Sequence, residues 1–211
     1  MPTMDRLVTQ VYQQLRHEIV TGVLRPNQPI VEADVAERLK VSRTPVRESL
    51  QRLATDGMVV SQRRRWVVYE FSADEVREIY EVRAALEGEA AALACQRMTE
   101  ELMAGIDEIE PAATRFHTVA RDERVEINNR FHGLIVQASG NSRLRNQVEQ
   151  NQLYYFNRQV AAMYSQEELA ESSRQHGELV DALRQRDAER AKAVAHHHVT
   201  DALAQIITKL F

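Results

Sequence analysis

The chain has 211 residues and a formal net charge of −4, and its 44% hydrophobic and 27% charged residues are ordinary for a globular protein of one or two domains. The single cysteine, Cys95, excludes an internal disulfide framework, and no run reaches the ~20 apolar residues that would span a bilayer. Residues 1–7 lack the apolar core of a signal peptide, so we expect a soluble protein of the reducing cytoplasm with no membrane contact.

The first predicted helix begins near Leu7 and stops at Gly22, and its apolar residues recur at helical spacing. They are Leu7, Val8, Val11, Leu15 and Ile19. A loop punctuated by two prolines follows, and then a short helix over Glu32–Leu39. Lys40–Val41 joins that helix tightly to the next one, which is the spacing of a helix-turn-helix.

The helix over Val41–Leu53 has the features of a DNA-recognition helix. Ser42 or Thr44 can cap its start, and Pro45 falls in the first turn, where a missing N–H costs nothing. A pair of arginines usually marks only a solvated helix face. In this position they crowd the end of the helix that a helix-turn-helix pushes into the major groove. The residues at that end are Arg43, Thr44 and Arg47.

Two β-rich runs, Met58–Val60 and Trp66–Tyr69, follow the recognition helix and flank a basic loop. We expect them to pair as a two-stranded wing. The arginines of the loop should contact DNA phosphates, because a guanidinium is attracted to phosphate whatever the base sequence. They are Arg63, Arg64 and Arg65.

Charge separates the chain into two parts. Residues 1–71 carry eleven Lys and Arg against eight Asp and Glu, a net charge of +3. Residues 72–211 carry sixteen against twenty-three, a net charge of −7. This split predicts a DNA-binding domain over residues 1–71, attached to a body over residues 72–211 that has no reason to touch phosphate.

The run from Leu15 to Val59, LRHEIVTGVLRPNQPIVEADVAERLKVSRTPVRESLQRLATDGMV, resembles the N-terminal domain of GntR-type bacterial transcription regulators. The resemblance implies that a dimer binds double-stranded operator DNA, with the wing in the adjacent minor groove. The helix residues that it implies in contact with bases and phosphates are Ser42, Arg43, Thr44 and Arg47. Three departures stand out: Ala33 replaces a frequent DNA-contacting Arg, Lys40 replaces a frequent turn Gly, and the wing has arginines where a Gly is usual.

Six predicted helices make up residues 72–211, and no strand signal reappears. Ser72 with Glu75 and Ser165 with Glu168 are capping boxes, which mark two of the helix starts. The predicted ranges are Ala73–Arg97, Glu100–His117 with a kink at Pro111, Asp122–Ser139, Ser142–Tyr164, Gln166–Arg186 and Ala188–Leu210. The predicted fold class is mainly α, with an N-terminal winged helix-turn-helix and a C-terminal all-α six-helix bundle.

Three of the seven histidines, His132, His176 and His198, share helix faces with apolar residues and should point into the bundle. A single inward histidine is usually a hydrogen-bonded core residue. Three on different helices, with an oxygen from Asn128, would instead suit a divalent ion such as zinc, nickel, manganese or iron. The other four should lie on the surface, and they are His17, His117, His196 and His197.

The body also resembles the helical effector domain of the FadR branch of GntR regulators, the FCD-type domain. The matching motifs are VRAALEGEAAALA, NNRFHGLIVQASGNSRL, QHGELVDAL and DAERAKAVAHHHV, and six rather than seven helices resemble the VanR-like subgroup. In metal-binding members an acidic residue and three histidines hold a divalent ion. The matching positions are Asn128, His132, His176 and His198, so that Asn128 replaces the usual Asp.

Arg83 and Glu87 lie one helical turn apart, which by itself predicts a modest surface ion pair. The resemblance implies another role, because an Arg at this place in the family commonly faces the ligand cavity. A planar guanidinium can bind a carboxylate through two hydrogen bonds. Arg83, with Glu87 beside it, is therefore the candidate binding site for a small organic acid.

Together these features predict a transcription regulator rather than an enzyme. We expect a repressor that dimerises through the helical body and changes its operator binding when a small carboxylate binds near the histidines. One alternative is a metal sensor, which would show metal-dependent DNA affinity without an organic ligand. A less favoured alternative is a helical metalloenzyme, which would show measurable turnover.

Overall fold

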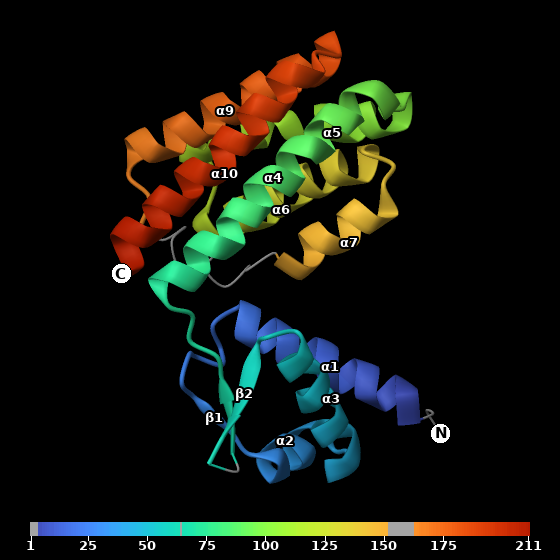
Figure 1. Cartoon of the computed structure of the whole chain (residues 1–211), viewed down its shortest axis with the longest axis vertical. Helices are drawn as coiled ribbons and strands as arrows, with labels where there is room; N and C mark the ends of the chain where they lie inside the picture. Colours follow the sequence, from blue (N-terminus) through green and yellow to red (C-terminus); the bar gives the residue numbers. More distant parts are fainter. Residues whose placement is uncertain (1–3, 64, 152–162) are drawn as a thin grey trace. The chain divides into compact units, whose positions relative to one another are not determined.

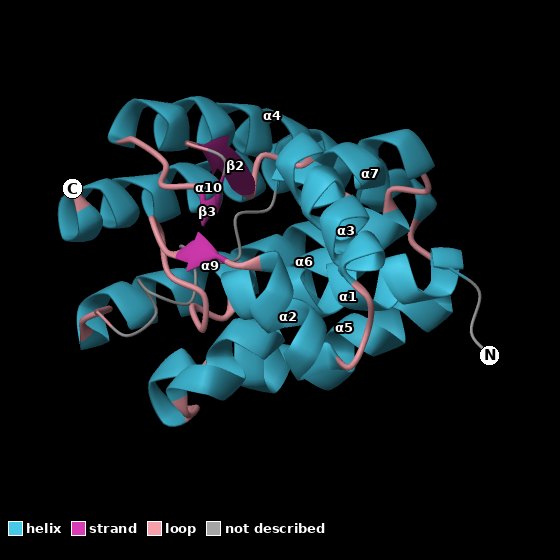
Figure 2. Ribbon diagram, turned by 90° about the horizontal axis from the view of Figure 1, so that it is seen from below, coloured by secondary structure: helices cyan, strands magenta, loops and turns pink. Residues whose placement is uncertain are grey.

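The computed structural model describes residues 4–63, 65–151 and 163–211, and it is mainly helical (Figure 1). The chain divides into two compact units, Met1–Phe71 and Ser72–Phe211. Figure 2 shows that the strands of the described chain belong to one small sheet. Among the described helices, none is both long and apolar enough to cross a bilayer.

The first unit contains a helix-turn-helix and a small antiparallel sheet. Its helices are α1 (Met4–Val20), α2 (Glu32–Leu39) and α3 (Arg43–Thr55), and its strands are β1 (Pro29–Ile30), β2 (Val59–Gln62) and β3 (Arg65–Val68). Completely buried apolar side chains of α1 and α3 form the centre of its core, to which α2 and the three strands add further buried residues. The central side chains are Leu15, Val46, Leu50 and Leu53.

The predicted hairpin is present as β2 and β3, but the two-stranded wing is a three-stranded sheet with the order β1-β3-β2. Pro29 and Ile30 pair with Val67 and Trp66 of β3. The strand β1 has only two residues, which is too short for an alternating hydrophobic pattern to be visible in the sequence. The sequence therefore predicts only a loop at this position.

The turn between α2 and α3 explains why Gly is frequent there. Lys40 has φ 54° and ψ 43°, in the left-handed region, and its N–H bonds to the carbonyls of Ala36 and Glu37. A side chain is disfavoured in that conformation, which Gly adopts at no cost. Ser42, one of the two predicted candidates, occupies the N-cap position of α3, but its side chain makes no capping hydrogen bond.

Helices are the regular structure of the described part of the second unit, and the predicted helices are present there. They are α4 (Ala73–Arg97), α5 (Glu100–Ala113), α6 (Arg121–Ala138), α7 (Ser142–Asn151), α9 (Gln166–Gln185) and α10 (Ala188–Leu210), with a 3₁₀ turn, η1, over Phe116–Thr118. Both predicted capping boxes form, at the starts of α4 and α9. The mainly α fold class is therefore confirmed.

Two predicted helix ends in this unit are wrong. The helix expected to reach His117 ends at Ala113, because the Thr114 hydroxyl caps the Glu110 carbonyl and the Phe116 N–H bonds to Ser173 on another helix. The described part of the helix predicted over Ser142–Tyr164 ends at Asn151, and Tyr164 is not helical. Residues 152–162 of that prediction lie outside the described residues.

The helices α4 and α10 run side by side through the second unit (Figure 1). At Gly88 an added Cβ would lie 3.2 Å from the Lys192 carbonyl oxygen, so the two backbones approach closely there. Completely buried residues of these two helices pack against those of α5, α6 and α9. Among them are Ala91, Ala94, Ile106, Phe131, Val180 and Ala191.

Candidate functional site

The candidate DNA-contacting residues of α3 gather at its N-terminal turn. Ser42, Arg43, Thr44 and Arg47 are all exposed there. The neighbouring Pro45, Val46 and Leu50 are buried, so the helix is fixed to the core by its opposite face. The first backbone N–H groups of a helix and its dipole also favour a negative group at this end. The turn can therefore present both guanidinium groups and backbone donors to a polyanion.

Glu32 holds one of these arginines in place. Its carboxylate accepts hydrogen bonds from Arg47 Nη2 at 2.9 Å and Nε at 3.2 Å, and from Trp66 Nε1 at 3.3 Å. The hydrogen bond from Arg47 is the main cause that lowers the pKa of Glu32 below its usual value. Three elements, α2, α3 and β3, thus meet at one carboxylate. No local sequence pattern marks this link, because the three residues are 15 to 34 positions apart in the chain.

The wing arginines lie around the turn between β2 and β3. Arg63 and Arg65 are exposed, and Arg63 has φ 48°, in the left-handed region where Gly is favoured. This conformation accounts for the Gly that is usual at the wing. Arg64 lies outside the described residues.

In the second unit, three helices bring His132 of α6, His176 of α9 and His198 of α10 together, as predicted. One ring nitrogen from each lies within 4.8 Å of the others, and the Nε2 atoms of His132 and His198 are 3.2 Å apart. His176 is completely buried, and the other two are partly buried. The four remaining histidines are exposed.

Hydrogen bonds on the far side of two rings fix which nitrogen faces the cluster. His176 Nδ1 lies 2.9 Å from the Ala113 carbonyl oxygen, which can only accept, so Nδ1 carries the proton. His176 Nε2 is then a buried acceptor, and it has no hydrogen-bond partner in the described part of the chain. His198 Nδ1 lies 2.8 Å from Gln175 Oε1. Such support of the outer nitrogen is typical of metal-binding histidines.

The environment keeps all three imidazoles neutral. Burial lowers the pKa of His176 to about 4. Burial is also the main cause that lowers the pKa of His132 and of His198 well below 6.5, and repulsion from His176 adds to it. The neutral imidazole is the form that binds a metal ion. Nitrogens about 2.0–2.1 Å from a tetrahedral zinc lie about 3.3 Å apart, so the Nε2 separation of His132 and His198 fits such an ion.

Asn128 is related to this cluster through a cavity that it shares with His198. Asn128 lies on α6 one turn before His132, and no hydrogen bond between described residues links its amide to the three histidines. It lines a cavity of about 80 Å³ together with His198. The other described lining residues are Phe116, Arg124, Val125, Tyr164, Leu169 and Ser172.

Arg83 and Glu87 form a buried ion pair, so their interpretation as a surface pair is wrong. Their exposed fractions are 8% and 5%, and Arg83 donates from Nη2 at 2.9 Å and from Nε at 3.1 Å to Glu87 Oε1. The other carboxylate oxygen lies 3.7 Å from His132 Nδ1. Arg83 Nη1 is buried without a hydrogen-bond partner among the described residues. Arg83 does not belong to the described lining of the 80 Å³ cavity.

Comparisons with known proteins match both units. Residues 7–68 match the bacterial regulatory proteins of the gntR family, and residues 78–201 match the FCD domain. The chain is 30% identical to the HTH-type transcriptional regulator YdhC of Bacillus subtilis over 206 residues, which cover 94% of this chain and 91% of YdhC.

Solved structures share the fold. The E. coli protein McbR/YncC superposes with a TM-score of 0.82 at 24% identity, over 100% of both chains. The metal-free FCD domain of TM0439 superposes with a TM-score of 0.51 at 23% identity, over 67% of this chain and 97% of that domain. The family matches and the relatives, which are named as transcription regulators, agree with the helix-turn-helix and the helical body. This chain therefore belongs to the GntR family and is a DNA-binding transcription regulator of its FadR-like branch, with a C-terminal FCD domain.

Proposed function

We propose that this regulator is a repressor whose operator affinity is set by a divalent metal ion and a small organic acid that bind in its FCD domain. The observation that carries the proposal is the cluster of three neutral imidazoles with the buried, unpartnered Nε2 atom of His176. A buried acceptor without a partner is unfavourable unless something donates to it or binds it. A metal ion would satisfy it, and could also be bound by the Nε2 atoms of His132 and His198, which lie 3.2 Å apart.

Metal binding by this cluster would use the nitrogens of His132, His176 and His198, with Asn128 as the candidate oxygen ligand. Such an ion would supply an electrophilic centre to which an anionic effector can bind. Zinc, nickel, manganese and iron all accept imidazole ligands. The structure of TM0439 is described as a metal-free FCD domain, which makes the metal state of such domains worth measuring. The amide of Asn128 brings no charge, so a weaker site than one with a carboxylate is expected.

Operator DNA would bind at the N-terminal turn of α3 and at the wing. The exposed side chains of Ser42, Arg43, Thr44 and Arg47 support base and phosphate contacts in the major groove. The wing arginines would neutralise phosphates, and they are Arg63, Arg64 and Arg65. We further propose a homodimer through the FCD domain. We also propose membership of the VanR-like subgroup, with which the six α-helices among the described residues of the second unit agree.

Arg83 and Glu87 are the proposed effector-binding pair. The unpartnered Nη1 atom of Arg83 supports this role, because a guanidinium that has bonded one carboxylate still has donors for a second one. The 3.7 Å separation of Glu87 and His132 places the pair beside the histidine cluster. An effector carboxylate that contacted both Arg83 and the histidine cluster would connect α4 to α6.

The test is DNA binding by the untagged protein, measured by fluorescence anisotropy on an operator selected in vitro. Metal-stripped protein, Zn²⁺-loaded protein and Zn²⁺-loaded protein with a panel of small organic acids are compared. An affinity that an acid lowers only in the loaded protein would support the proposal. An affinity set by Zn²⁺ alone would instead favour the metal sensor, and an affinity that neither changes would contradict both.

A further inference from the structure

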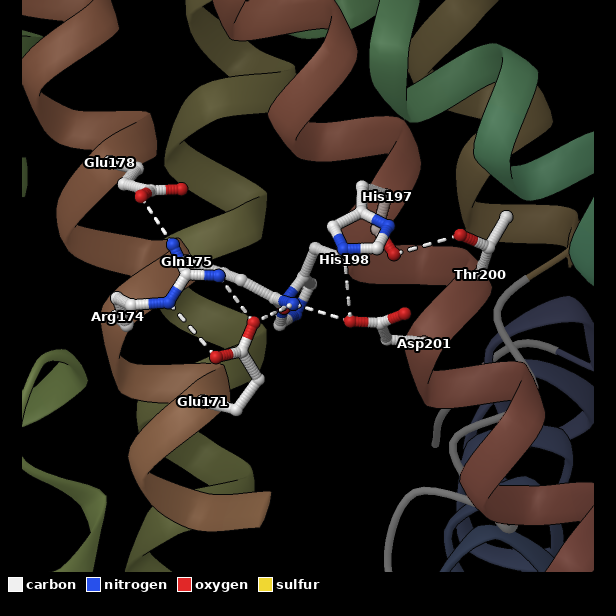
Figure 3. A network of polar contacts seen from close by, with 8 residues as sticks. All are labelled: Glu171, Arg174, Gln175, Glu178, His197, His198, Thr200 and Asp201. Atoms are coloured by element: carbon white, nitrogen blue, oxygen red, sulfur yellow. Dashed lines mark hydrogen bonds and ion pairs between the residues drawn. The ribbon is translucent and has the colours of Figure 1, made fainter. Parts of the chain in front are cut away.

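Beside the histidine cluster, a polar network joins α9 to α10 (Figure 3). At its centre is Gln175, which is only 2% exposed. Its Nε2 atom donates to Glu171 Oε1 at 3.0 Å and to Asp201 Oδ2 at 2.5 Å. Its Oε1 atom lies 2.8 Å from His198 Nδ1. One side-chain amide therefore connects two carboxylates to one of the three clustered imidazoles.

The two carboxylates determine which way this amide points. A carboxylate can only accept hydrogen bonds, and an amide NH₂ group has two hydrogens to donate. In the observed orientation each carboxylate of Glu171 and Asp201 receives one hydrogen. The flipped orientation would place the amide oxygen against two negatively charged oxygens. The orientation thus follows from charge and does not depend on telling N from O by their positions alone.

The orientation of Gln175 in turn determines the tautomer of His198. The amide oxygen is an acceptor, so the neutral ring of His198 must carry its proton on Nδ1. The lone pair of His198 is then on Nε2, the atom that lies 3.2 Å from His132 Nε2. In the opposite tautomer, His198 Nε2 would carry the proton and would have no lone pair to offer a metal ion.

We propose that Gln175, anchored by Glu171 and Asp201, is the positioning residue that makes His198 a ligand through Nε2. This inference rests on the proposed metal site. It distinguishes His198 from His176, whose Nδ1 bonds to the backbone carbonyl of Ala113. No side-chain substitution removes that carbonyl, so of these two histidines it is His198 whose tautomer a side chain controls.

The outer carboxylates serve as an anchor and not as a second cation site. Glu171, His197 and Asp201 are close enough to hold an ion, within 4.8 Å of one another. Arg174 Nη2, however, already lies 2.5 Å from Glu171 Oε1, the atom that Gln175 also binds. Asp201 Oδ2 binds Gln175 and lies 3.3 Å from His197 Nε2. Positive and donor groups of the protein therefore satisfy these oxygens.

The experiment measures the tautomer and the metal affinity in the full-length, untagged protein. Histidine ring ¹⁵N NMR of the metal-stripped protein reports which nitrogen of His198 is protonated, and a Zn²⁺ titration against a chelator reports the affinity. In wild type we expect the Nδ1–H form. Gln175→Leu should populate the other tautomer and weaken Zn²⁺ binding by ~10–100-fold, while the Nδ1–H signal of His176 persists.

Two further variants separate positioning from folding. The double variant Glu171→Gln/Asp201→Asn keeps Gln175 but removes both charges that hold its amide, so the Nδ1–H fraction should fall without a cavity in the core. Glu178→Gln is the matched control, because Glu178 binds Arg174 in the same network and makes no bond to Gln175. It should change neither readout.

The outcomes also distinguish this inference from the proposed function. An Nε2–H form of His198 in metal-stripped wild type would overturn the role of Gln175, and so would an unchanged tautomer and affinity in Gln175→Leu. Absence of Zn²⁺ binding in wild type would overturn the metal in the proposed function, whereas the tautomer populations would still decide what Gln175 does.

Discussion

The N-terminal turn of α3 and the histidine cluster of the FCD domain are built in opposite ways. The first takes four exposed residues from six consecutive positions, 42–47, and needs only one helix to align them. The second takes its nitrogens from α6, α9 and α10, and depends on a backbone carbonyl and on Gln175 to orient two rings. In an exposed site on one helix, a single side chain can be replaced without disturbing the others. In a buried site built from several helices, replacing one group also changes the position or protonation of its neighbours.

The largest expected effect is on stability, at the buried Arg83 beside the histidine cluster. Replacing Arg83 by Ala leaves the Glu87 carboxylate buried without its partner, which should lower the free energy of unfolding by about 3–5 kcal/mol. The double variant Arg83→Met/Glu87→Gln should regain most of that loss. Arg77→Ala, at an exposed pair with Asp74 on the same helix, should cost less than about 1 kcal/mol. Urea denaturation compares the three, and a loss at Arg83 no greater than at Arg77 would contradict the buried pair.

Metal affinity gives the next largest effect. His176→Ala removes a ligand and should weaken Zn²⁺ binding by at least ~100-fold, since groups that only support a ligand already change it by ~10–100-fold. Asn128→Asp adds a charge beside the cavity and should tighten binding. Metal analysis and chelator competition on untagged protein measure both. His196→Ala, at an exposed histidine of α10, is the control. Equal, near-zero metal in wild type and all variants would mean that the histidines only line the cavity.

DNA binding should separate the recognition helix from the wing. Arg43→Ala should cost about 1–3 kcal/mol on the operator and little on unrelated DNA, because it removes a base contact. Arg65→Ala should weaken binding to both DNAs and reduce the salt slope by about one, because it removes a phosphate contact. Anisotropy titrations at several salt concentrations measure both. Equal losses on operator and unrelated DNA for Arg43→Ala would remove it from base recognition.

The smallest expected effect is at Lys40. Its left-handed conformation disfavours a side chain, so Lys40→Gly should relieve strain in the folded N-terminal unit. Because Gly also gives the unfolded chain more conformational entropy, the net stabilisation should be at most about 1 kcal/mol. The midpoint temperature of the first unit's thermal unfolding transition reports the change in stability. Lys192→Gly, in the regular helix α10, should instead destabilise the protein by about 1 kcal/mol. A loss of stability at Lys40 would show that its side chain contributes more than the strain costs.

The sequence predicted those features that depend only on residues close together in the chain. The capping boxes at Ser72 and Ser165 form with both of their hydrogen bonds, because all of the partners lie within three residues. Helical spacing also predicted the right three inward histidines, because the faces of α6, α9 and α10 that carry them are apolar.

Contacts between distant segments were missed. The end of α5 depends on Ser173, and the strand β1 depends on β3. The spacing of Arg83 and Glu87 alone predicted a surface pair, because α4 has buried residues around most of its circumference and no single face of the helix marks the core. Glu32 and Gln175 each connect elements that no local pattern relates.

The carboxylate of Glu32 has a consequence for how tightly, and how selectively, DNA can be held. An unrestrained Arg gives up about 2 kcal/mol of rotamer entropy when a complex immobilises it. Arg47, bonded to Glu32 through Nε and Nη2, has already lost part of that freedom in the folded monomer. The pair is also close to electrically neutral, so it should release few counterions when DNA binds. Arg47 would then contribute shape and hydrogen bonds to recognition, and Arg43 and the wing would contribute most of the ionic attraction.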